Sequence, residues 1–145
     1  QISLYPNRRI TSIFMVDGEN NLRKLVKALN PKLNDGEYVF TTVNDIESLD
    51  IKEVICAFRG EEEITLVLKK SKADQLGLKY YFIASWITLK IHSSLNAVGL
   101  TSIFSTELAK NKISCNIIAG YYHDHIFVPT KDSLRALNIL RNLSD

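Results

Sequence analysis

The strongest constraint on this fold is a change of hydrophobic period near the middle of the chain. Between residues 86 and 92, apolar Ile87, Leu89 and Ile91 alternate with polar residues. A period of two is typical of a half-buried β-strand. After Gly99 the spacing becomes helical, and the apolar positions are Leu100, Ile103, Phe104 and Leu108. The sequence therefore predicts a strand, a turn at Gly99 and an amphipathic helix.

The rest of the second half extends this pattern. Two short strand-like runs follow at residues 115–119 and 125–128, and a second helical pattern then places Leu134, Leu137, Leu140 and Leu143 on one face. The predicted order is β-α-β-β-α, which is the ferredoxin-like order without its closing strand. An α+β fold is the expected class.

The first half shows similar signals. Residues 17–21 can cap a helix that has Leu22, Leu25, Val26 and Leu29 on one face, and Asn30-Pro31 ends it. A strand is predicted at residues 38–43, and a hairpin at 54–58 and 64–68 turns at Gly60. Ser71 is expected to cap a short helix that has Asp74 three residues on and ends just before Gly77. No flexible linker separates the halves, so we expect them to pack as one unit.

Residues 20–143 resemble the small tandem ACT-domain proteins, most specifically in the second half. The runs that carry the resemblance are LNDGEYVF at 33–40, WITL at 86–89, HSSL at 92–95, AVGLT at 97–101 and ISCNIIAGYYHDHIFV at 113–128. The resemblance implies two ferredoxin-like βαββαβ halves, residues 17–82 and 83–145, whose antiparallel sheets carry helices on one face. The surplus strand at 38–43 is expected to complete the second half's sheet.

Residues 1–16 are expected to be an N-terminal extension that includes vector-derived or upstream-translated sequence. They lack the uninterrupted apolar core of a signal peptide. The run 10–16 can nevertheless form a strand, and we assign the extension no function.

Composition excludes several functional classes. A net charge of +2 gives no electrostatic basis for binding nucleic acid. No apolar run approaches the ~20 residues of a membrane-spanning helix. Cys56 and Cys115 both lie in apolar runs, as expected of buried free thiols in a reducing, cytoplasmic compartment, although a disulfide between them stays open.

The turn before the central helix is the candidate ligand site. A helix that begins near Gly99 presents unpaired N–H groups and a positive dipole end, which suit a carboxylate. Glycine also allows close backbone approach. The candidate residues at this turn are His92, Ser93, Ser94, Asn96, Gly99, Leu100 and Thr101. The alternative interpretation is that these polar residues only form a turn and a helix cap.

The resemblance adds a second group of candidate residues. ACT domains place amino-acid ligands at this turn, often against the second strand of a neighbouring unit. Here that strand holds Asn116, Ile117 and Ile118. The resemblance thus implies an amino acid or a related carboxylate as ligand and leaves its identity open.

The histidines near the C-terminal hairpin raise the question of metal. In a strand, His123 and His125 share one face and Asp124 takes the other. A zinc site usually needs a third or fourth protein ligand, so we expect no metal. Because the sequence has neither a nucleophile elbow nor a phosphate-binding glycine loop, we also expect no catalytic residue and no cofactor. Asp124 also fits a hairpin turn.

The sequence therefore predicts a regulatory small-molecule binding module without catalysis of its own, which we expect to form a homodimer. One alternative is a structural protein whose ACT-like sheets mediate assembly or partner binding without a ligand. A third interpretation is a metal-dependent enzyme that uses His123 and His125.

Overall fold

The computed structural model describes residues 21–91 and 94–145. The strands are β1 (Pro31–Leu33), β2 (Tyr38–Val43), β3 (Val54–Arg59), β4 (Ile64–Lys69), β5 (Ile83–Leu89), β6 (Asn116–Ala119) and β7 (Asp124–Pro129). The helices are α1 (Leu22–Lys27), α2 (Lys70–Gln75), α3 (Leu100–Lys110) and α4 (Ser133–Asn142), with short 3₁₀ turns at Ile51–Glu53 and Thr130–Asp132. The predicted strand at residues 10–16 lies outside the described residues.

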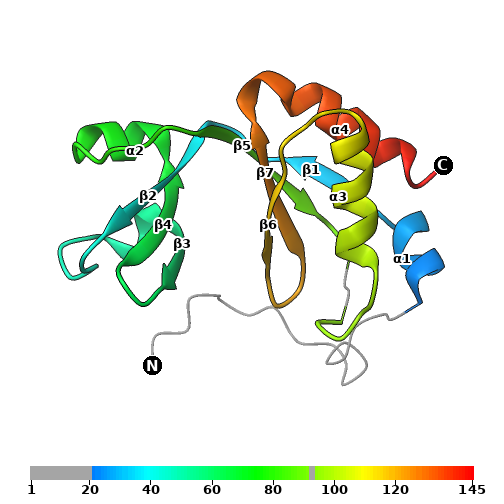
Figure 1. Cartoon of the computed structure of the whole chain (residues 1–145), viewed down its shortest axis with the longest axis horizontal. Coiled ribbons are helices and arrows are strands. Elements are labelled where there is room, and N and C mark those ends of the chain that lie inside the picture. Colours follow the sequence, from blue (N-terminus) through cyan, green and yellow to red (C-terminus); the bar gives the residue numbers. More distant parts are fainter. Residues whose placement is uncertain (1–20, 92–93) are drawn as a thin grey trace.

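The described strands form one antiparallel sheet that runs through both halves of the protein (Figure 1). The strand order is β3-β4-β2-β5-β7-β6, and β1 pairs with β5. The first half is therefore β3-β4-β2, and the second is β1-β5-β7-β6. The α+β class, the ferredoxin-like halves and the antiparallel pairing are confirmed.

The strand that completes the second half is β1, whereas the sequence predicts residues 38–43 for this role. Pro31, Lys32 and Leu33 pair with Leu89, Thr88 and Ile87 of β5. In contrast, β2 pairs along its whole length with β4, and only Tyr38 and Val39 pair with β5. A strand of three residues that begins with proline is too short to show an alternating pattern, and proline favours a sheet edge.

Asn34 fixes β1 to the central strand. Its backbone N–H donates to the carbonyl of Trp86 over 2.9 Å. Its side-chain amide also donates to that carbonyl, over 3.2 Å, and to Oγ1 of Thr88, over 2.9 Å. These bonds place the turn at residues 34–36 against β5, so a segment from the first half becomes part of the second.

One apolar core lies between the second half's sheet and α1, α3 and α4. Ile87 and Leu89 of β5 alternate with residues of the opposite face, as the period-two pattern predicts, and they meet Leu100, Phe104 and Leu108 of α3 here. Leu25 of α1 is also buried in this core. Residues 22–33 belong to the first half in sequence but pack into the second, so the two halves share segments. The boundary between the halves at residues 82 and 83 stays a prediction.

Two details of the predicted helices are wrong. Ser71 is not a cap, since α2 begins at Lys70 and its N-cap is Lys69, which makes no side-chain capping bond. In α4, Leu134 is 67% exposed and Ala136 is buried instead. The start of α1 is confirmed, because Oδ1 of Asn21 accepts from the N–H of Lys24.

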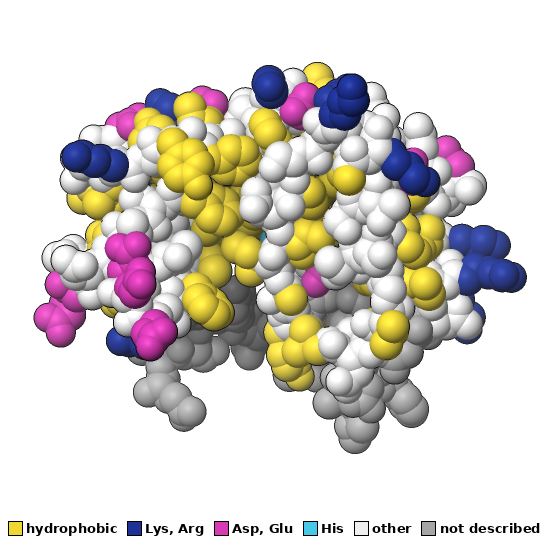
Figure 2. Space-filling view, viewed as in Figure 1, with side chains coloured by type: hydrophobic (Ala, Val, Ile, Leu, Met, Phe, Trp, Pro, Cys, Tyr) yellow, Lys and Arg dark blue, Asp and Glu magenta, His cyan; other side chains and the backbone are white. Residues whose placement is uncertain are grey.

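The sheet face opposite the helices carries an aromatic cluster, formed by Tyr38, Phe40, Phe82, Trp86 and Phe127. The Trp86 ring stacks on Phe127 at a centroid distance of 6.1 Å, and the Tyr38 ring meets Trp86 edge-on at 5.3 Å. Figure 2 shows apolar side chains gathered over the middle of the molecule, between the halves. None of the helices in the described ranges has the length and hydropathy that a membrane-spanning helix requires.

Candidate functional site

The predicted ligand turn lies between the end of β5 and the start of α3. His92 and Ser93 lie outside the described residues. Oγ of Ser94 accepts a hydrogen bond from the N–H of Asn96 over 3.0 Å, and the carbonyl of Ser94 accepts from Ala97. Ser94 therefore builds the turn, in agreement with the alternative interpretation, while no hydrogen bond from the side chain of Asn96 is found within the described residues.

The start of α3 is a positively polarised helix end. Its N-cap is Gly99, which supplies no side-chain hydrogen bond, and the first turn contains no acidic residue. The first N–H groups of a helix have no partner within it. The N–H groups of Leu100 and Thr101 lie at this end, and Thr101 is exposed whereas Leu100 is buried. The geometry suits an anion such as a carboxylate.

The structure explains why residue 99 is a glycine. Its φ of +92° lies in the left-handed region that side chains rarely adopt. A Cβ atom built on Gly99 would approach Cδ2 of Leu22 to 3.3 Å. The space beside this glycine is therefore occupied by α1, and we expect a ligand to approach the N–H groups that follow it.

The structure does not unite the two predicted groups of site residues within one chain. Asn116 pairs with Phe127, whereas Ala119 pairs with Asp124 at the turn's end of the sheet. At about 3.3 Å per residue, Asn116 lies roughly 10 Å along β6 from Ala119. Ile117 packs into the helix-side core and Ile118 against the aromatic cluster. Their role beside a neighbouring unit's turn stays a prediction.

Asp124 lies closer to the turn than the sequence indicates. The prediction made it a hairpin residue, but it is the first residue of β7 and pairs with Leu89, the last residue of β5. Paired residues point to the same face of a sheet, so Asp124 shares the helix side with Leu89. Partial burial raises the pKa of its carboxyl, and the neighbouring His123 opposes this increase. Asp124 lies two residues before Ile126 and four before Val128, and this alternation could have predicted its position on the helix side of the sheet.

The two histidines of the hairpin make structural hydrogen bonds. Nδ1 of His123 lies 2.9 Å from the carbonyl of Ile91 and therefore donates to it. Nδ1 of His125 accepts from the indole Nε1–H of Trp86 over 3.0 Å, which places the proton of the neutral ring on Nε2. Within the described ranges, no three His, Cys, Asp or Glu side chains are grouped as a metal site.

The contact between Trp86 and His125 predicts a dependence of stability on pH. Burial, followed by the nearby His123, lowers the pKa of His125 below its usual 6.5. If Nδ1 of His125 were protonated, its N–H would face the indole N–H of Trp86, and two donors cannot form a hydrogen bond. The folded state therefore binds fewer protons than the unfolded state, and this stability is lost as pH falls below about 6.5. One group can contribute a slope of at most about 1.4 kcal/mol per pH unit.

We expect the parent to lose more unfolding free energy between pH 7.5 and 5.5 than His125→Asn, whose amide oxygen can replace Nδ1 as acceptor without titrating. Denaturant unfolding at both pH values measures the difference. The raised pKa of Asp124 makes stability change with pH in the opposite direction. Because both proteins contain Asp124, its contribution cancels when their losses are compared. Equal losses in parent and variant would contradict this assignment.

Cys56 and Cys115 are free, as expected, and each is partly rather than fully buried. Burial raises the pKa of the Cys115 thiol to about 11. This thiol is therefore protonated and unreactive near neutral pH.

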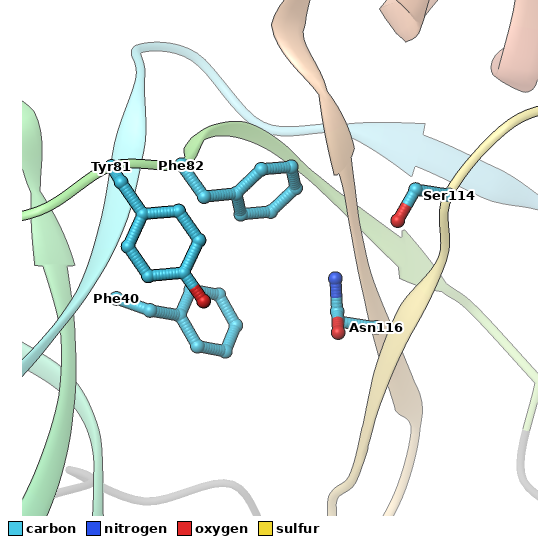
Figure 3. A pocket seen from close by; sticks show the side chains of 5 residues that line it. All are labelled: Phe40, Tyr81, Phe82, Ser114 and Asn116. Atoms are coloured by element: carbon cyan, nitrogen blue, oxygen red, sulfur yellow. The ribbon is translucent and has the colours of Figure 1, made fainter.

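A separate pocket of about 260 Å³ lies on the sheet between the halves (Figure 3). It is lined by Phe40, Tyr81, Phe82, Ser114 and Asn116. Sequence reasoning missed it because its walls come from three distant segments. Among the predicted site residues that the structure describes, Asn116 is the one that lines it.

Models of the ACT domain match residues 17–85 and residues 82–142. A comparison with curated protein sequences gives no match. A solved protein of unknown function from Vibrio cholerae is 45% identical, with 87% of this chain and 98% of that chain covered and a TM-score of 0.77.

Aspartate kinases share the fold at low identity. The regulatory subunit of aspartate kinase from Thermus thermophilus is 12% identical, with 81% of this chain and 100% of that chain covered and a TM-score of 0.51. The aspartate kinase of Clostridium acetobutylicum is also 12% identical, with 81% of this chain but 34% of that chain covered and a TM-score of 0.62. With two matched units across one continuous sheet, the chain belongs to the ACT-domain family as a tandem ACT protein.

Proposed function

We propose that this protein is a regulatory module that binds an amino acid or a related small carboxylate at the start of α3, without catalysis of its own. The observation that carries this proposal is the uncapped N-terminus of α3, an 11-residue helix with no acidic residue in its first turn. Family membership supports a regulatory ligand-binding role. The similarity to a regulatory subunit of aspartate kinase supports the fold of such a module.

In the proposed complex, the ligand carboxylate accepts hydrogen bonds from the N–H groups of Leu100 and Thr101. Asn96 lies in the exposed turn before the helix, and we assign its side-chain amide to the ligand. Asp124 lies at the same end of the sheet with a partly buried carboxyl, so it can face an ammonium group. The two charged ends of an amino acid would then meet groups of opposite polarity.

A thermal-shift screen against the amino acids tests this proposal. A ligand at 100 times its dissociation constant stabilises the folded state by about 2.7 kcal/mol. We expect Asn96→Ala to reduce the shift while the variant keeps the parent's cooperative unfolding. Asn142→Ala, at the end of α4, is the matched control. If no amino acid or small carboxylate stabilises the parent, the proposal fails.

One observation favours assembly as a second function. Leu95 and Val98 beside the turn are 68% and 85% exposed, and Tyr121 in the hairpin between β6 and β7 is 62% exposed. Apolar side chains gathered at one end of a sheet are typical of an interface. We propose a homodimer through this end, and a monomer of 16.5 kDa in sedimentation at micromolar concentration would exclude it.

The free cysteines support a cytoplasmic location.

A further inference from the structure

We propose that the pocket between the halves is a second binding site, specific for a neutral heteroaromatic ring whose edge carries a hydrogen-bond donor beside an acceptor. Figure 3 shows the rings of Phe40, Tyr81 and Phe82 on one side and the side chains of Ser114 and Asn116 on the other. A volume of about 260 Å³ suits one ring with a small substituent.

The apolar wall is held in place by buried neighbours. The ring of Phe40 meets that of Phe82 at a centroid distance of 6.2 Å and that of Phe127 at 5.3 Å. Phe127 is 1% exposed and stacks on Trp86. Because these contacts fix the two rings that line the pocket, a planar ligand would meet a preformed surface, which lowers the entropic cost of binding.

Tyr81 provides a third aromatic surface that packing does not hold. Its side chain is 100% exposed, although a tyrosine ring is largely apolar. Figure 3 places this ring beside Phe40 at the edge of the pocket. A ligand ring inserted there would cover part of Tyr81, and aromatic rings contact each other favourably edge-on or offset.

The opposite wall selects the chemistry of the ligand. Ser114 and Asn116 are exposed, and neither side chain has a hydrogen-bond partner among the described residues. The amide of Asn116 extends toward the aromatic rings (Figure 3). It offers a donor and an acceptor side by side, which can pair with a ring edge that presents the complementary couple. None of the described residues that line the pocket is charged, so the ring should be neutral.

This site is separate from the start of α3. Asn116 is the first residue of β6, three positions from Ala119 at the turn's end, and none of Asn96, Leu100, Thr101 and Asp124 lines the pocket. Binding here therefore does not depend on the proposed amino-acid site, and either proposal can fail without the other.

Nicotinamide is a suitable probe, because its neutral pyridine ring carries at its edge a carboxamide, whose N–H donor lies beside its carbonyl acceptor. We expect it to shift the side-chain amide resonances of Asn116 and the backbone amides of Tyr81 and Phe82 in ¹H–¹⁵N NMR spectra of the whole chain. A fragment of this size should bind saturably, with a dissociation constant on the order of 1 mM. Cyclohexanecarboxamide, which lacks the planar ring, and nicotinate, which carries a charge, should each bind at least fivefold more weakly.

Two variants test the walls of the pocket. Tyr81→Ala should weaken nicotinamide at least fivefold without changing stability, whereas Phe58→Ala, at another aromatic residue that is exposed but does not line the pocket, should leave the affinity unchanged. Asn116→Leu keeps the side-chain size but removes the amide, and it should also weaken binding at least fivefold. The proposal is overturned if nicotinamide gives no saturable shifts, if its two analogues bind equally well, or if Tyr81→Ala and Asn116→Leu bind like the parent.

Discussion

Replacing Leu25 by alanine is expected to lower the free energy of unfolding by about 2–5 kcal/mol. Leu25 belongs to α1 near the start of the described chain, but it is 2% exposed within the core that α3, α4, β5 and β7 form. The variant removes buried methyl groups and leaves a cavity that the surrounding helices fill only partly. Because the cavity lies in the second half's core, the whole sheet should unfold in one transition.

Denaturant unfolding followed by circular dichroism and by fluorescence of Trp86, the single tryptophan, measures this effect. Leu134→Ala is the matched control, since the same side chain is removed from a position that is 67% exposed. It should change stability by no more than about 0.5 kcal/mol. A loss below about 1 kcal/mol for Leu25→Ala, or two separate transitions, would show that α1 is not part of the second half's core.

Introducing a carboxylate at the start of α3 is expected to change stability and ligand binding in opposite directions. Thr101→Asp places a negative charge in the first turn of α3, where the helix dipole favours it by about 0.3–1 kcal/mol. The same charge would repel a ligand carboxylate from the N–H groups of Leu100 and Thr101. The stabilisation of about 2.7 kcal/mol expected at 100 times the dissociation constant should therefore disappear.

Thermal unfolding with and without the amino acid found in the screen separates the two effects. Thr101→Asn is the matched control, because it has the same size as the aspartate variant without its charge, and it should keep most of the ligand-induced shift. A full shift in Thr101→Asp would mean that the carboxylate binds elsewhere. In that case the turn from Ser94 to Thr101 would be only a helix start.

The candidate site shows how far local sequence can specify a binding geometry. The position of α3, the turn before it and the left-handed glycine are predictable from a change of period and one residue type. The contact of Gly99 with Leu22 is not predictable in this way, because the two residues lie 77 positions apart in the sequence. The partial burial of Asp124 likewise depends on which residues flank it in the folded sheet.

The sequence by itself determined most of the helices and strands, since amphipathic periods, turns and caps depend on residues a few positions apart. Only the tertiary structure decided that β1 rather than β2 completes the second half, that α1 enters its core and that Leu134 faces solvent. It also assembled the pocket from Phe40, Phe82 and Asn116. The physical reason is that pairing between distant segments is set by competition among all available edges and apolar faces, and no short stretch of sequence records its outcome.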